Sequence, residues 1–141
     1  MKELESKVEE FLIWVDKEYK VKFAYLFGSQ ARGEANDDSD IDIGIYFYNK
    51  YDSLNEAIVR GTIMEMGKEF FHKDVDIVSL RNSTLLMKYQ VIKDGIVVFD
   101  KDERAEFESL SLRMYFDFKY YTDIYDNAMI DSIKNGDYFG G

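Results

Sequence analysis

Two short apolar segments, joined by a polar connection that contains glycine, constrain the fold of this chain more than any other feature. Residues 21–27 are mostly apolar and end at a glycine, and residues 40–45 alternate strictly between two kinds of side chain. Strict alternation is typical of a β-strand with one buried face. We expect a strand over 40–47 whose isoleucines pack on helices, while Asp40 and Asp42 face an open cleft.

The remaining pattern predicts a chain in which helices and strands alternate. Helices are expected over 3–18, 54–70, 83–93 and 102–130, strands over 21–27, 40–47, 74–80 and 96–99, and a turn or short helix over 29–33. Asp52 or Ser53 is a suitable N-cap for the second helix, and Gly61 and Gly67 weaken the prediction for its middle. At 141 residues this is one domain, with room for a helical extension.

Composition excludes several classes of protein. The chain has no cysteine, which rules out a disulfide framework and a thiolate zinc site. The first residues are charged and no apolar run approaches membrane-spanning length, so we expect a cytoplasmic protein without a membrane partner. The net charge of −10 repels polyanions, and no stable nucleic-acid partner is expected.

Carboxylates on the predicted strands indicate a metal site. Asp40 and Asp42 lie on one strand face, where their side chains can converge on a hard cation. Mg²⁺ prefers oxygen ligands and often binds two carboxylates together with substrate phosphates. A third carboxylate on an adjacent strand would complete a nucleotidyl-transfer site, and Asp76 is suitably placed. Asp74 falls on the same predicted face and is the rival assignment.

The acidic cluster has two other interpretations, a solvated turn and a calcium-binding loop. Asp37, Asp38 and their neighbours could form a solvated turn, since such residues favour turns. A calcium-binding EF-hand loop starting at Asp38 fails, because Ile43 stands where glycine is required and Asn49 where glutamate is required.

The bend at Gly28 and Ser29 is suited to holding a phosphate. Glycine lets the backbone approach an anion closely, and the Ser29 hydroxyl adds a donor. Arg32 either contacts a phosphate or ties down the loop through a surface ion pair. The bend is not a P-loop, because no Gly-Lys-Ser/Thr follows.

Taken together, these residues resemble a known motif. Gly28-Ser29-Gln30-Ala31-Arg32-Gly33 followed by Asp38-Ser39-Asp40-Ile41-Asp42 closely resembles the motif of the DNA polymerase β-like nucleotidyltransferase superfamily. More narrowly, it looks like that of the minimal nucleotidyltransferases, the MNT antitoxins encoded beside HEPN ribonuclease toxins. The resemblance extends to Val75-Asp76-Ile77-Val78 as the third-carboxylate strand. It implies an α+β fold, in which a small mixed β-sheet is flanked by helices, followed here by a long C-terminal helix.

The resemblance also implies an activity and a role for each motif residue. Such antitoxins transfer AMP from ATP to a tyrosine hydroxyl of the HEPN toxin, which neutralises it. By this resemblance, Gly28 and Ser29 would hold the triphosphate with Arg32 beside them, and Asp40 and Asp42 would bind Mg²⁺. Asp76 would complete the metal site and help deprotonate the nucleophile. Gln30 stands where arginine is frequent in the family.

Two further functions remain open at this stage. An aminoglycoside-type nucleotidyltransferase would need an added helical substrate domain, and after residue 100 the pattern predicts one long helix. The other is a non-catalytic antitoxin that masks its toxin. We therefore expect a nucleotidyltransferase core over 1–100 and, over 101–141, a C-terminal helix and tail that pack on the core or on a partner. An apolar stripe at helical spacing fits either arrangement: Phe107, Leu110, Met114, Phe118, Tyr121, Tyr125 and Ala128.

Overall fold

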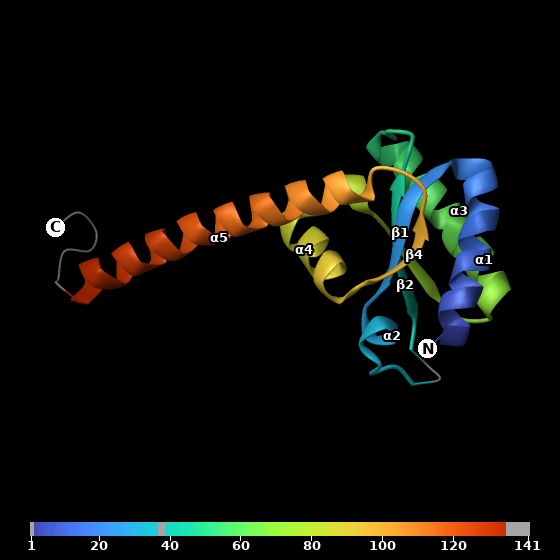
Figure 1. Ribbon diagram of the computed structural model, residues 1–141, viewed down its shortest axis with the longest axis horizontal. Helices are drawn as coiled ribbons and strands as arrows, with labels where there is room; N and C mark the ends of the chain where they lie inside the picture. The colour runs from blue at the N-terminus through green and yellow to red at the C-terminus, as the bar shows by residue number, and fades with distance from the viewer. Residues whose placement is uncertain (1, 37–38, 135–141) are drawn as a thin grey trace.

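A computed structural model describes residues 2–36 and 39–134 as a four-stranded sheet flanked by helices (Figure 1). This confirms the predicted α+β class. The helices are α1 (Lys2–Tyr19), α2 (Ser29–Arg32), α3 (Ser53–Phe71), α4 (Leu85–Asp94) and α5 (Arg104–Lys134), with a short 3₁₀ turn η1 (Leu80–Asn82). The strands are β1 (Val21–Phe27), β2 (Ile41–Phe47), β3 (Val75–Ser79) and β4 (Ile96–Asp100). No helix in the described part is long and apolar enough to span a membrane.

The sheet is mixed, and its topology brings one end of each of β1, β2 and β3 to the same end of the sheet. The strand order is β3-β2-β1-β4, in which β1 runs antiparallel to both β2 and β4, while β2 and β3 are parallel. Because β1 is antiparallel to β2, its C-terminal end lies beside the N-terminal end of β2. Because β2 and β3 are parallel, the N-terminal end of β3 lies at the same end of the sheet.

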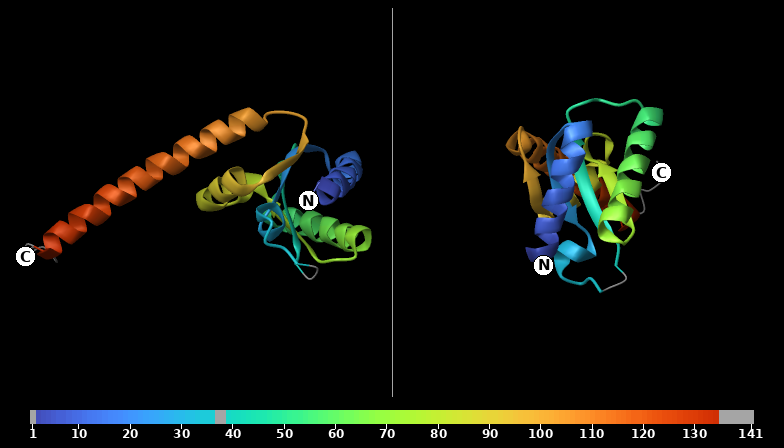
Figure 2. Two further views of the ribbon diagram at one scale, coloured as in Figure 1. Left: turned by 60° about the horizontal axis from the view of Figure 1, so that its bottom comes forward. Right: turned by 90° about the vertical axis from the view of Figure 1, so that its right-hand side faces the viewer.

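One face of the sheet carries the larger core. Helices α1 and α3 cover it, as the views in Figure 2 also show. The isoleucines of β2 are buried there, which confirms the predicted orientation of that strand. Gly67 in α3 is explained by this packing, because a Cβ at that position would come within 2.9 Å of Val75 on β3. Gly61 faces open space, so no contact requires it.

Helix α4 and the start of α5 cover the other face. The buried residues here are Phe23, Tyr25, Leu80 and Val91, with Phe107 of α5 packed against them. The Tyr25 hydroxyl donates to Glu108 Oε1 at 2.7 Å, which ties α5 to the central strand. Burial, assisted by this hydrogen bond, raises the pKa of Tyr25, so it remains a neutral donor.

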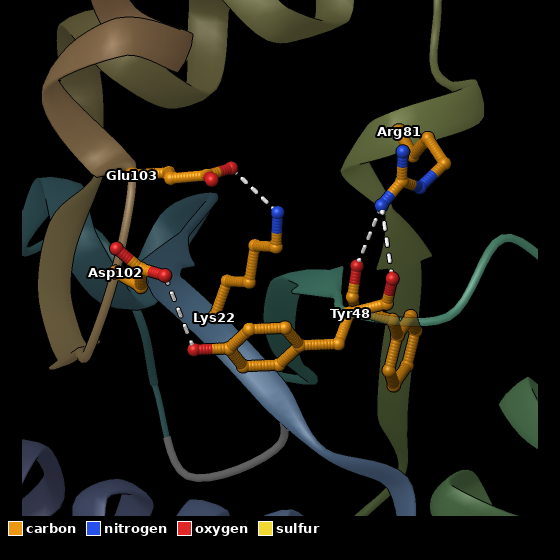
Figure 3. Close-up of polar contacts among 6 residues, drawn as sticks. Lys22, Tyr48, Arg81, Asp102 and Glu103 are labelled. Atoms are coloured by element: carbon orange, nitrogen blue, oxygen red, sulfur yellow. Dashed lines mark hydrogen bonds and ion pairs between the residues drawn. The ribbon is translucent and has the colours of Figure 1, made fainter.

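A polar network fixes the start of α5 beside Lys22, near the N-terminal end of β1 (Figure 3). Lys22 Nζ donates to Glu103 Oε2 at 2.5 Å, and the Tyr48 hydroxyl donates to Asp102 at 3.5 Å. Arg81 donates to the carbonyl oxygens of Phe47 and Tyr48, at 2.9 and 3.3 Å. The Lys22 and Tyr48 contacts hold the loop between β4 and α5 against the start of β1 and the end of β2, and the Arg81 contacts join η1 to the end of β2.

Most element boundaries fall within two residues of the predicted ones. Asp52 caps α3, since its side chain accepts from the Asn55 amide at 2.8 Å. The η1 turn was not predicted and separates β3 from α4. The predicted tail, 135–141, lies outside the described residues.

Helix α5 does not lie flat on the sheet. Figures 1 and 2 show it leaving the core beyond α4 and projecting outward. Phe107 is packed and Ser111 is buried, but from residue 116 to 131 every residue except Thr122 is exposed. The interpretation that this helix simply covers the sheet is therefore wrong for its outer half.

Candidate active site

The bend after β1 is built around two glycines. Gly28 has φ 74° and ψ −154°, a conformation open essentially to glycine alone. It leads into the single turn of α2, which ends at Gly33 in the left-handed region with φ 74° and ψ 16°. A Cβ on Gly28 would overlap the Asp42 carboxylate, whereas one on Gly33 would meet nothing within 4 Å. Gly28 is thus the residue that lets the bend sit directly against Asp42.

Strand register brings two of the predicted carboxylates together. Phe27 at the end of β1 pairs with Asp42, and Asp42 pairs with Asp76 on β3. Asp40 lies exposed, one residue before β2 begins, and Asp76 is also exposed. Asp42 is half-buried between them and the Gly28 bend. The three acidic residues therefore lie at one end of the sheet, beside the turn predicted to hold phosphate.

The electrostatics of Asp42 reflect this crowding. Its burial, followed by repulsion from the carboxylates of Asp76 and Asp40, raises the pKa of the Asp42 carboxyl. The Arg32 guanidinium acts in the opposite direction. A bound cation would remove both the repulsion and part of the cost of burying the charge.

Asp74 occupies a different environment from Asp76. Its backbone carbonyl accepts from the Ile41 amide at 3.1 Å, at the start of the β2–β3 ladder. Its side chain is largely exposed and lies 3.9 Å from the Lys68 ammonium. Asp74 is not among the groups that perturb Asp42, whereas Asp76 is. Geometry therefore favours Asp76 over its rival as the neighbour of Asp42.

Arg32 pairs with Glu34 at 3.1 Å on the surface, which matches the loop-tying alternative. Exposed pairs of this kind are worth at most about 1 kcal/mol, so Arg32 can exchange Glu34 for a phosphate at little cost. Asp37 and Asp38, assigned to the acidic loop by the sequence, lie outside the described residues.

Gln30 is a residue whose structural role the sequence did not reveal. It is 7% exposed, and its side-chain amide donates to the Ser39 carbonyl at 3.3 Å. This hydrogen bond joins the Gly28 bend to Ser39, the residue just before Asp40. The only available signal was that Gln30 follows Gly28-Ser29 in the motif, which says nothing of its burial.

The residues present fit a magnesium site of the kind completed by substrate. Within 2–36 and 39–134, no three acidic or histidine side chains form a ready-made metal cage. Mg²⁺ usually takes one or two carboxylates and fills its remaining positions with phosphate oxygens and water. Asp42 with a neighbouring carboxylate, beside a glycine bend that lies directly against the Asp42 carboxylate, supplies that donor set.

Comparisons with known proteins agree with this geometry. The family described as "Polymerase beta, Nucleotidyltransferase" matches residues 9–104, which contain all four strands and the carboxylates of Asp40, Asp42, Asp74 and Asp76.

Among curated proteins, the chain is similar to the protein adenylyltransferase MntA of Shewanella oneidensis, with 29% identity over 97 residues, 68% of this chain and 67% of that protein. It is 32% identical over 97 residues to the protein adenylyltransferase MntA of Aphanizomenon flos-aquae, covering 62% of this chain and 64% of that one. The matched part thus spans about two thirds of these relatives.

Solved structures extend the likeness into the C-terminal helix. A crystal structure of a toxin–antitoxin with AMP-PNP superposes with a TM-score of 0.70 at 26% identity, covering 86% of this chain and 98% of that one. A structure of a tri-AMPylated Shewanella oneidensis HEPN toxin in complex with MNT antitoxin gives a TM-score of 0.66 at 26% identity, covering 92% and 99%.

Proposed function

Since the chain belongs to the polymerase β nucleotidyltransferase family, we propose that it is an antitoxin that transfers AMP from ATP to a tyrosine hydroxyl of a HEPN ribonuclease toxin. The observation that carries the proposal is the pairing of Asp42 with Asp76 against the Gly28 bend. The relatives named as protein adenylyltransferases and the complex with an AMPylated HEPN toxin support it. We also propose a cytoplasmic location, because the proposed reaction consumes ATP.

Each residue at the site has a defined task in this reaction. Gly28 and Ser29 hold the triphosphate, and Arg32 turns from Glu34 to a phosphate oxygen. Asp40, Asp42 and Asp76 would hold Mg²⁺, which when bound stabilises negative charge on the attacking and leaving oxygens. Gly28 keeps the bend in contact with Asp42, so phosphates held by the bend would lie next to the Asp42 carboxylate.

The chemical step is an in-line displacement at the α-phosphorus of ATP. The tyrosine oxygen forms a new bond to this phosphorus, the bond to the bridging oxygen of the β-phosphate breaks, and pyrophosphate leaves. A phenol has a pKa near 10, so its proton must be removed as the bond forms. Asp76 is exposed at the site and accepts that proton. The remaining contribution of the protein is positioning and electrostatic stabilisation.

A variant pair tests these assignments. Asp76→Asn should lower AMP transfer at least 100-fold, because both a carboxylate ligand and the proton acceptor are lost. Asp74→Asn is the matched control, two residues away on the same segment, and should retain transfer within about threefold. Equal losses in the two variants would overturn the assignment of Asp76.

Masking without catalysis is the second candidate, and the exposed outer half of α5 favours it as an added mechanism. Pure masking requires that an Asp40→Ala, Asp42→Ala double variant still neutralises the toxin in cells. We expect this variant to bind the toxin, remain folded and fail to neutralise it. Full protection by the double variant would show that binding is sufficient.

A further inference from the structure

The inner face of α5 continues beyond the core as an exposed apolar stripe. Phe107 and Ser111 lie on the side of the helix that contacts the domain. Continuing along the same side at spacings of three and four gives four large residues, which we call the α5 stripe: Met114, Phe118, Tyr121 and Tyr125. They are between 50% and 69% exposed.

The stripe begins in an apolar groove between α4 and α5. The groove has a volume of about 410 Å³ and is lined by Thr84, Leu85 and Leu86 on the α4 side and by Tyr115, Phe118, Lys119 and Thr122 on α5. Tyr115 stacks on Tyr89 of α4, with ring centroids 3.8 Å apart and planes 7° from parallel, which holds the two helices together at this point. Leu86 itself is 57% exposed.

The outer half of α5 has little tertiary packing to stabilise it, because from residue 116 to 131 every residue except Thr122 is exposed. At 1.5 Å per residue, the 31-residue α5 is about 46 Å long, and this exposed part is about half of it. Isolated helical segments of 12–15 residues are marginal in water, and most helices in proteins depend on burying an apolar face. An exposed helical segment that carries aromatic side chains on one side is therefore suited to a partner that covers them.

Charges beside the stripe specify what that partner must look like. Asp117 and Asp126 border the stripe on opposite sides of the helix, as the helical repeat of 3.6 residues requires. Between 117 and 131 the helix carries four aspartates and one lysine. A second copy of this chain would place aspartates against aspartates, and each copy already carries a net charge of −10. A partner with basic side chains on both sides of an apolar ridge is complementary.

We propose that the α4–α5 groove and the α5 stripe form the docking surface for an amphipathic helix of the toxin, whose apolar ridge is flanked by lysine or arginine. This deepens the proposed function and rests on it for the identity of the partner. The toxin helix lies along α5 in the helix-in-groove manner, with its apolar side chains on Phe118, Tyr121 and Tyr125 and its cations beside Asp117 and Asp126.

The experiment compares two double variants that differ only in the side of α5 they change. Phe118→Glu with Tyr121→Glu alters the stripe, and Tyr120→Glu with Asn127→Glu adds the same two charges on the opposite side. All four residues are exposed. Each double variant is made in an Asp42→Asn background, so that the toxin stays unmodified, and helix content is checked by circular dichroism.

Titration calorimetry measures the affinity for the protein encoded by the adjacent reading frame, which the proposed function requires to be a HEPN toxin. We expect the stripe variant to bind at least 100-fold more weakly than the parent, and the control variant to bind within about threefold of it. An Asp117→Lys, Asp126→Lys variant should also bind more weakly and show a smaller dependence on salt.

The outcomes separate this inference from the proposed function. Equal binding by the stripe and control variants overturns the docking surface, whether or not the wild-type chain transfers AMP. Loss confined to the stripe variant supports the docking surface even if the wild-type chain transfers no AMP, in which case the enzymatic function fails alone. A dimer of the chain by analytical ultracentrifugation that the stripe variant abolishes would assign the surface to a second copy and overturn the proposal. Absence of wild-type binding to the toxin overturns both.

Discussion

Replacing Gly28 with alanine tests whether AMP transfer depends on the close contact between the Gly28 bend and Asp42. The new Cβ would overlap the Asp42 carboxylate, so either the bend or that side chain must move. The backbone conformation, φ 74° and ψ −154°, adds strain of about 1–3 kcal/mol for a non-glycine residue. A displacement of about 1 Å in a catalytic group can lower a rate about 100-fold.

Gly33→Ala is the matched control for this change. Gly33 has the same φ of 74° but lies in the left-handed helical region, and its added Cβ meets nothing within 4 Å. It should cost about 1–2 kcal/mol of stability through backbone strain alone. Both variants therefore strain the same turn, but only Gly28→Ala pushes on a carboxylate.

The assay is AMP transfer to the toxin, with urea unfolding run in parallel. We expect Gly28→Ala to lower transfer at least 100-fold at saturating ATP while the protein remains folded, and Gly33→Ala to retain transfer within about fivefold. Similar transfer rates in the two variants would refute the argument, because they would show that contact between Gly28 and Asp42 has no catalytic consequence.

Three further predictions concern stability. Because burial and neighbouring carboxylates raise the pKa of Asp42 in the folded state, the wild-type protein loses stability as pH rises through that pKa. Asp42→Asn should therefore unfold at a higher urea concentration than wild type near pH 7 without Mg²⁺, and this difference should vanish near pH 4. Equal urea midpoints for the two proteins at both pH values would contradict the cause assigned to the pKa shift. Adding Mg²⁺ and ATP should raise the melting temperature of wild type and not that of Asp42→Asn, which thermal scans with and without both ligands can measure. In α3, Gly61→Ala should stabilise the protein by about 0.5–1 kcal/mol and Gly67→Ala should destabilise it, because only the second Cβ meets Val75; stabilisation by both would refute the packing explanation for Gly67.

Local signals were sufficient for much of the fold. The strand over 21–27 and the alternating segment after Asp40 were readable because side-chain periodicity reports which face is buried. Side-chain chemistry limited the cap of α3 to Asp52 or Ser53, and the structure shows that it is Asp52. In the sequence, Gly67 only weakens the prediction of a helix. The structure explains it by the close approach of α3 to Val75 on β3, which no local sequence pattern encodes.

The candidate site was only partly readable for the same reason. The spacing of Asp40 and Asp42 indicated a shared face, but the choice between Asp74 and Asp76 depends on the register of β3 against β2, a long-range property. The burial of Gln30 depends on the path of the acidic loop. The apolar stripe of α5 was visible at helical spacing, yet spacing alone cannot distinguish a face that packs on its own sheet from one that projects toward a partner.

Adenylyl transfer is tested most directly by intact-mass spectrometry of the protein encoded by the adjacent reading frame, after incubation with this chain, ATP and Mg²⁺. We expect that protein to be a HEPN toxin whose mass increases by whole AMP units, and we expect Asp42→Asn to abolish the increase. An unchanged mass in the presence of folded, toxin-bound wild-type protein would contradict the proposed transfer.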